Sequence, residues 1–274
     1  MMAAETQVQR TPPPPELAYP PAPDGIPDDT VAAGPYEVAF ARTTGDLESL
    51  QKLRFAVFNE ELGEGLDESY ETGRDEDEFD AGCHHLIVWH APTGAMAGTY
   101  RLQTQQMALR ANGFYSAVEF DLSALPTDVV DQAVEIGRAC IAKEHRSLKV
   151  LYLLWCGLGM YLHHNNKRYL FGCNSLTSQD PAEGRAVMQY LRMNGHVHPA
   201  LHVQPTPEYV CYGNVSAEAV EATKAKVPRL MRAYLSFGAK ILGPPALDRR
   251  FKTIDYLAFF DAERLDERTL AYFR

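Results

Sequence analysis

The chain has 274 residues, of which 46% are hydrophobic and 23% are charged, the composition of a globular protein that can bury a core. Its formal net charge is −10, which argues against nucleic acid as a partner because phosphate binding needs a basic face. No stretch approaches the roughly 18 consecutive apolar residues of a membrane-spanning helix, and the N-terminus lacks a basic region followed by an apolar one. We therefore expect neither a membrane span nor a secretory signal.

Five cysteines are scattered along the chain, and three of them lie inside apolar runs. An odd, widely spaced set in a chain of this size indicates reduced core thiols in a cytoplasmic protein rather than a disulfide framework. A catalytic or metal-binding cysteine is the alternative, but no group of cysteines and histidines has the spacing of a zinc site. We expect a cytoplasmic location and no metal.

Acidic residues are concentrated in one segment. Eleven of the 36 acidic side chains, but only one of the 26 basic ones, fall between Glu60 and Asp80. The rest of the chain is balanced, so this segment carries the whole net charge. Such a run is typical of a solvated loop. The alternative is that part of it binds a cationic substrate.

The first 35 residues contain nine of the eighteen prolines, four of them consecutive. Because proline lacks the backbone N–H that helices and sheets need, residues 1–35 are expected to form a disordered, partly extended tail. The folded domain is then expected to span residues 36–274.

From residue 36 onward the hydrophobic pattern becomes regular. Alternating or continuous apolar runs predict strands at 36–40, 86–89, 98–102, 133–141, 169–173 and 253–260. Helical spacing and longer apolar runs predict helices at 46–62, 150–163, 181–193 and 228–237. A Pro-Thr-Gly turn joins the second and third strands into a hairpin. The order of elements predicts an α/β fold with a mixed sheet and two parallel crossovers.

Several short motifs follow one another in a fixed order. They are the helix residues 54–58, Gly98-Thr99-Tyr100-Arg101-Leu102, Gly113-Phe114-Tyr115-Ser116, Glu135-Ile136-Gly137-Arg138 and Gly243-Pro244-Pro245-Ala246. On these motifs the chain resembles the N-acyltransferases that make ornithine lipids and related N-acyl amino acids. That family is often labelled hemolysin-like and is related to the acyl-homoserine-lactone synthases. The resemblance runs from about residue 36 to the C-terminus. It implies the GCN5-related N-acetyltransferase-like fold, a mixed sheet splayed at the central strands and flanked by helices.

The resemblance implies that the α-amine of an amino acid attacks a thioester carried by acyl carrier protein. A free α-amine is mostly protonated at pH 7, so a positioned base that takes its proton contributes about 10²–10⁴-fold to the rate. Glu135 is the candidate base, because it lies between Val134 and Ile136 in an apolar strand. If both neighbours face the core, alternation directs Glu135 at the opposite face. In the related lactone synthases the matching glutamate is assigned this role. The alternative is a strand carboxylate paired with Arg138.

The residues after Glu135 bear on how the donor binds. Alternation would direct Arg138 away from Glu135 unless the strand is bulged. In this superfamily such a bulge opens the sheet for the pantetheine arm, and Gly137 permits it. The superfamily's pyrophosphate loop, (Gln/Arg)-x-x-Gly-x-(Gly/Ala), is absent. A helix N-terminus with Arg146 and Lys149 can hold one phosphate, which favours the single phosphodiester of a carrier-protein arm over coenzyme A.

We therefore expect no bound cofactor, with the acyl-phosphopantetheine of acyl carrier protein as co-substrate. Acyl carrier proteins are acidic, so basic side chains are expected to form a docking patch. Its expected members are Arg138, Lys143, Arg146, Lys149, Lys167 and Arg168. The alternative is an ordinary set of surface bases.

The resemblance also assigns residues outside this strand. Arg54 corresponds to an arginine near the active site and is expected to be catalytic together with Glu135; its alternative role is an ion pair with a neighbouring glutamate. Asp80 corresponds to a carboxylate on the substrate side. His85 matches the histidine of the family's Cys-Asp-His-Leu pattern, whereas His84 replaces its acid and so bears on which acceptor is used. Asp80 and His85 are expected to contact the substrate amine.

The expected function is transfer of a long acyl chain, 3-hydroxylated or otherwise, from acyl carrier protein to the α-amine of ornithine or a similar amino acid. The product would be of the lyso-ornithine-lipid type, and because it is amphiphilic we expect a cytoplasmic enzyme that transiently touches the inner membrane. One alternative is an N-acyl amino acid or acyl-homoserine-lactone signal synthase, although the tryptophan usual after the position of Phe58 in the lactone enzymes is missing. Another is a non-catalytic carrier- or membrane-binding protein.

Overall fold

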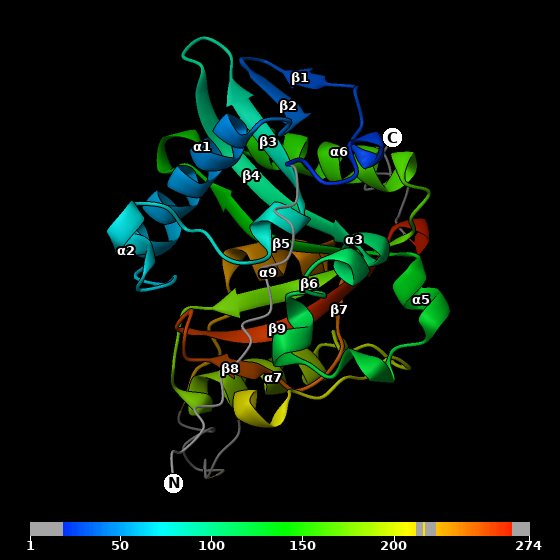
Figure 1. Cartoon of the computed structure of the whole chain (residues 1–274). Coiled ribbons are helices and arrows are strands. Elements are labelled where there is room, and N and C mark those ends of the chain that lie inside the picture. The colour runs from blue at the N-terminus through cyan, green and yellow to red at the C-terminus, as the bar shows by residue number, and fades with distance from the viewer. Residues whose placement is uncertain (1–18, 212–215, 217–222, 265–274) are drawn as a thin grey trace, which may run out of the picture.

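The computed structural model describes residues 19–211, 216 and 223–264 (Figure 1). Within them, nine strands form one mixed sheet in the order β1-β2-β3-β4-β5-β6-β9-β7, with β8 also paired to β9. The strands are β1 Val31–Ala33, β2 Tyr36–Phe40, β3 His84–His90, β4 Ala95–Thr104, β5 Ala133–Ile141, β6 Tyr169–Leu176, β7 Lys240–Ile241, β8 Ala246–Asp248 and β9 Thr253–Asp261. The predicted α/β mixed sheet and its hairpin, β3–β4, are confirmed.

Helices cover both faces of the sheet (Figure 1). They are α1 Thr44–Phe55, α2 Ser69–Thr72, α3 Gln105–Arg110, α4 Ser116–Glu119, α5 Thr127–Asp131, α6 Leu148–His164, α7 Pro181–Met193 and α9 Arg229–Ser236. On one face, α6 packs across β1 to β5, and α7 and α9 pack on β6 and β9. On the other face lie α1, over β3 and β4, and the segment of α3 and α4, over β6 and β9. None of the helices in these ranges has the length and apolar character that crossing a membrane requires.

Local signals explain where these elements begin. Thr43 starts α1 with a capping box, in which its hydroxyl accepts from the Asp46 N–H at 3.1 Å and Asp46 accepts from the Thr43 N–H at 3.0 Å. The helix then continues as a π-helical turn, Ala56–Glu61. The single helix predicted over 46–62 therefore has nearly the right extent, but its hydrogen-bond pattern changes at residue 56.

The expectation of two parallel crossovers is wrong for the described strands. Only β5 and β6 are parallel among the named strand pairs there. The hairpin of β8 and β9 reverses the chain, so β9 enters the sheet antiparallel to β6.

The N-terminal boundary also differs from the expectation. Residues 19–35 belong to the fold, because Val31–Ala33 forms the edge strand β1 on β2. The prolines of this stretch lie outside β1, so they remove no donor from the ladder. The Asn165 side chain at the end of α6 also donates to the Gly25 carbonyl at 2.9 Å. The part of the expected tail at 1–18 lies outside the described residues.

The sheet splits between β5 and β6, as the resemblance implies. Their pairing covers only the three residues Ala133, Val134 and Glu135, whereas β5 runs on to residue 141 and β6 to residue 176. On its other edge β5 bulges against β4, where the register shifts. The left-handed residue of this bulge is Arg138, at φ 49°, and not the expected Gly137.

The point where the two strands part depends on Gly172 of β6. A methyl group at Gly172 would overlap the Ile136 carbonyl oxygen, a backbone atom that cannot rotate away. We expect Gly172→Ala to lower the free energy of unfolding by about 1–3 kcal/mol, measured by urea denaturation. Gly137→Ala is the matched control, because a methyl there meets no atom within 4 Å. Equal stability of both variants would contradict this account of the split.

Candidate active site

A cavity of about 570 Å³ lies in the split of the sheet. Because its lining combines side chains from both faces, the cavity passes between β5 and β6 from one face to the other. On the helix-covered face of α6 and α9 it is apolar, with Trp155, Leu158, Tyr234 and Phe237 in its wall. On the opposite face its wall is polar and contains Arg101, Gln103, Tyr115, Glu135 and Arg138.

Glu135 lies on the polar side, in the orientation that strand alternation predicts. Its carboxylate accepts hydrogen bonds from the backbone N–H groups of Tyr115 at 2.9 Å and Ser116 at 2.7 Å. The residue is 6% exposed, and burial raises the pKa of its carboxyl although these hydrogen bonds act in the opposite direction. A carboxylate has about four acceptor positions, so Glu135 is fixed in place and can still accept a proton from the cavity.

Gln103 is directly opposite Glu135 on β4. It is 1% exposed, lines the cavity, and neither its amide oxygen nor its amide nitrogen has a hydrogen-bond partner among the described residues. A buried amide without partners is unfavourable unless a ligand or water satisfies it. Sequence reasoning missed this residue, because a glutamine in a strand gives no local signal and only the strand register brings it to Glu135.

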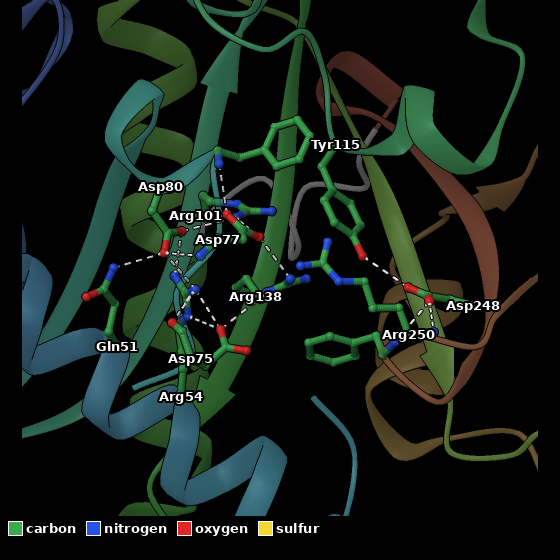
Figure 2. Close-up of polar contacts among 12 residues, drawn as sticks. Gln51, Arg54, Asp75, Asp77, Asp80, Arg101, Tyr115, Arg138, Asp248 and Arg250 are labelled. Atoms are coloured by element: carbon green, nitrogen blue, oxygen red, sulfur yellow. Dashed lines mark hydrogen bonds and ion pairs between the residues drawn. The ribbon is translucent and has the colours of Figure 1, made fainter. Parts of the chain in front are cut away.

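Three arginines and three aspartates form a buried ion-pair network beside the cavity (Figure 2). Its members are Arg54, Arg101, Arg138, Asp75, Asp77 and Asp80. The aspartates belong to the acidic segment, and none of the six side chains is more than 7% exposed. The segment is therefore not simply a solvated loop.

The ion pairs of the network are short, and several of its side chains have more than one partner. Arg54 contacts Asp75 at 2.6 Å and Asp80 at 2.9 Å, and Arg101 contacts Asp80 at 3.0 Å. Asp77 joins Arg101 at 2.6 Å to Arg138 at 2.9 Å. Burial opposes the ionisation of Asp80, but the guanidinium groups around it, Arg54 foremost, hold its pKa well below the usual range.

Arg138 turns back toward the cavity because of the bulge. Its guanidinium carbon lies 4.8 Å from the centre of the Tyr115 ring and 4.3 Å from that of Phe251, a cation–π arrangement. It therefore shares a face with Glu135 and Arg101, instead of pointing away as simple alternation would require.

Three of the predicted site residues do not line the cavity. Arg54 is fully buried, and its partners are Asp75 and Asp80, not a neighbouring glutamate. Asp80 is occupied by arginines, and His85 lies behind it with Nε2 at 3.6 Å from the Asp80 carboxylate. Burial lowers the pKa of His85, so its ring is neutral at pH 7. Arg54 and Asp80 are thus paired within the network, with His85 behind them. The contacts of Asp80 and His85 with a substrate amine, and the catalytic role of Arg54, stay predictions.

The expected donor-binding residues are only partly together. Arg146 lines the cavity and forms a two-pronged ion pair with Glu61, at 2.6 and 2.7 Å. Lys149 is exposed in the first turn of α6. Arg138 lines the cavity too, but its side chain is 7% exposed, so it is not part of a surface docking patch.

The other expected members of the docking patch are divided between two places. Lys143 is exposed beside Arg146, before α6, whereas Lys167 and Arg168 follow the other end of this helix. At a rise of 1.5 Å per residue the two groups are separated by about 25 Å. The single patch expected from the sequence is therefore wrong, because α6 keeps its ends apart.

The ion-pair network should be required for stability. Removing the charge of Asp80 leaves buried Arg54 and Arg101 without full compensation, so Asp80→Asn is expected to lower the free energy of unfolding by about 3–5 kcal/mol. Glu76→Gln is the control: this acid pairs with Arg74 at the surface, where loss of the pair should cost less than about 1 kcal/mol. Chemical denaturation at pH 7 measures both. A small effect of Asp80→Asn would refute the structural role of the network.

Known proteins are similar to this chain over most of its length. Residues 53–156 match the family model described as an acetyltransferase (GNAT) domain. The chain is 32% identical over 251 residues to the L-ornithine N(alpha)-acyltransferase of Brucella abortus, covering 88% of this chain and 89% of that protein. It is 31% identical over 247 residues to the enzyme of the same name from Rhizobium meliloti, covering 86% and 83%. Among solved structures, a CoA-dependent acyl-homoserine lactone synthase, BjaI, aligns over 84% of this chain and 81% of its own, with a TM-score of 0.45 and 14% identity.

Relatives named acyltransferases that match most of the chain, together with the GNAT match over residues 53–156, make this protein an N-acyltransferase with a GNAT domain. Within that class, the chain belongs to the family of the L-ornithine N(alpha)-acyltransferases. The resemblance, the fold and the enzyme class predicted from the sequence are confirmed.

Proposed function

We propose that this enzyme transfers a long acyl chain from the phosphopantetheine arm of acyl carrier protein to the α-amine of ornithine. The observation that carries the proposal is the position of Glu135, a held carboxylate in the wall of a cavity that crosses the split sheet. The acceptor is supported by relatives named for ornithine acylation that match most of this chain.

On the acceptor side, Glu135 provides the base. The neutral α-amine attacks the thioester carbon, the nitrogen–carbon bond forms, and Glu135 takes up the proton that the nitrogen releases. The carbon–sulfur bond then breaks, and the proton passes to the leaving thiolate. Gln103, with no partner of its own among the described residues, is placed to hydrogen-bond the amine or the thioester oxygen.

On the donor side, the split offers both polar and apolar contacts. Beyond Glu135 no ladder pairs β5 with β6, so backbone groups on the facing edges can hydrogen-bond the amides of a pantetheine arm, much as an added strand would. The aromatic and aliphatic wall between α6 and α9 suits the acyl chain, because each methylene removed from water contributes about 0.8 kcal/mol.

The carrier protein is supported by the charges at one end of the cavity. Arg146 lines it, Lys143 and Lys149 are exposed beside the start of α6, and the helix N-terminus attracts a phosphate. The product would be an N-acyl ornithine of the lyso-ornithine-lipid type. Because such a product is amphiphilic, we infer a cytoplasmic enzyme that transiently meets the inner membrane.

The reaction can be tested directly. We expect the protein, mixed with ornithine and a 3-hydroxyacyl carrier protein, to give Nα-acyl ornithine by mass spectrometry. Glu135→Gln should lower kcat/KM about 100-fold or more, because the base is lost. Glu48→Gln, at an exposed carboxylate that does not line the cavity, should leave it unchanged. A folded enzyme that acylates no amino acid, or a Glu135→Gln variant with wild-type turnover, would disprove the proposal.

The carrier-protein donor gives a separate expectation. Charge reversal in Lys143→Glu/Lys149→Glu should raise KM for an acyl carrier protein about tenfold, because an acidic partner loses its complement. The KM for a small acyl-pantetheine donor should stay constant, since neither lysine lines the cavity. Lys226→Glu, at an exposed site near α7, serves as control. If the double variant affects both donors alike, the lysines do not recognise the carrier.

A further inference from the structure

A second group of acids lies on the same face of the sheet as Glu135. Glu119 at the end of α4, Asp248 in β8 and Asp255 in β9 bring one carboxylate oxygen each within 4.8 Å of one another. They are 1%, 4% and 2% exposed. The proposed acyl transfer gives them no role.

This group lacks the arginines that compensate the other buried acids. No Lys, Arg or His among the described residues forms an ion pair with any of the three. Asp248 accepts backbone N–H groups, and Thr253 donates to one oxygen of Asp255 at 2.9 Å. Both oxygens of Glu119 and the second oxygen of Asp255 have no hydrogen-bond partner in this part of the chain.

Burying such a group of acids without a cation is energetically unfavourable. Buried charges need compensation, and here burial and the neighbouring acids raise the pKa of Asp255 to about 6 and that of Glu119 well above its usual value. Without a cation, the raised pKa values favour a protonated group over one that carries its full negative charge. A buried ligand with positive charge would remove this cost.

One member of the group borders the proposed acceptor site. Asp255 lines the same cavity as Glu135. Tyr115 links the two places, since its N–H donates to Glu135 at 2.9 Å. Its hydroxyl donates to Asp248 at 3.3 Å (Figure 2). Along β6, Phe171 is paired with Glu135 and Ser175 with Asp255, a separation of about 13 Å along the strand.

We propose that Glu119, Asp248 and Asp255 bind the side-chain ammonium of a diamino-acid acceptor while Glu135 faces its α-amine. This assignment rests on the proposed function. An ammonium group has three N–H donors, which equals the number of carboxylate oxygens without a partner. In an extended five-carbon diamino acid the two nitrogens are about 6 Å apart for single bonds of about 1.5 Å. A hydrogen bond of about 2.9 Å at each end extends the reach of such a molecule to about 12 Å between acceptor oxygens.

The site would make the enzyme selective for charge at the end of the acceptor. Norvaline has the carbon chain of ornithine without the terminal amine, so it would leave the buried oxygens without a partner. Sites built to bind a substrate N–H reject analogues that lack it strongly. We expect wild-type kcat/KM for ornithine to exceed that for norvaline about 100-fold or more.

The decisive experiment measures both acceptors with wild type, Glu119→Gln and Asp255→Asn. The variants should reduce the ornithine-to-norvaline ratio at least about tenfold, chiefly through KM for ornithine, with norvaline turnover kept or raised. Asp121→Asn, an exposed acid two residues from Glu119, should leave the ratio unchanged. Equal losses with both acceptors, or equal wild-type use of both, would overturn the assignment. A folded enzyme inactive with every amino acid would instead remove the proposed function.

A thermal-shift measurement on the wild-type protein tests the assignment even if a variant fails to fold. Ornithine should raise the Tm of the wild-type protein without donor, in the presence of a chelator, and norvaline should not. Equal shifts by both, or a shift by Ca²⁺ or Mg²⁺ but none by ornithine, would refute an ammonium site. The second result would assign the oxygens to a divalent cation, which prefers the same ligands.

Discussion

The buried pairing of three arginines with three aspartates is the constraint on which the active site depends. It ties α1, β4, β5 and the acidic segment into one arrangement, because moving any of them would leave a charge in the interior without its partner. It also accounts for the unusual backbone of Arg138. A left-handed conformation costs a residue other than glycine about 1–2 kcal/mol, and the ion pairs to Asp75 and Asp77 with stacking on two aromatic rings offset that cost.

Strand β5 is irregular along both of its edges: it bulges against β4 and separates from β6. On the β4 side, the bulge of β5 brings Arg138 to the face of Glu135. On the β6 side, pairing ends at Glu135, where the Ile136 carbonyl approaches Gly172. The strand therefore carries the Glu135 carboxylate just where an opening through the sheet begins. An acyl donor entering from the α6 and α9 face and an amine entering from the other face would meet beside that residue.

Structural features that are set by residues close together in the sequence were predicted correctly. The strand 133–141 and the helix 181–193 form with the predicted bounds, since an apolar run and an Asp-Pro start are local signals. The direction of Glu135 followed from alternation alone. What failed depends on distant partners: the acids at 75, 77 and 80 lie in a segment typical of a solvated loop, and only the fold brings them to arginines on α1, β4 and β5. Gln103, Glu119 and Asp255 gave no signal for the same reason.

The two sets of buried acids show why an acidic run is a poor guide to the binding of a cation. The three buried aspartates of the acidic segment are matched by three guanidinium groups, so they have no net attraction left for a substrate. Glu119, Asp248 and Asp255 come from three separate elements and have no such partner in the described chain. In a buried site the local balance of charge, rather than the density of acids along the sequence, determines where a cation is stabilised. By that balance, the uncompensated acids Glu119, Asp248 and Asp255, and not the segment rich in acids, are where a cation would be stabilised.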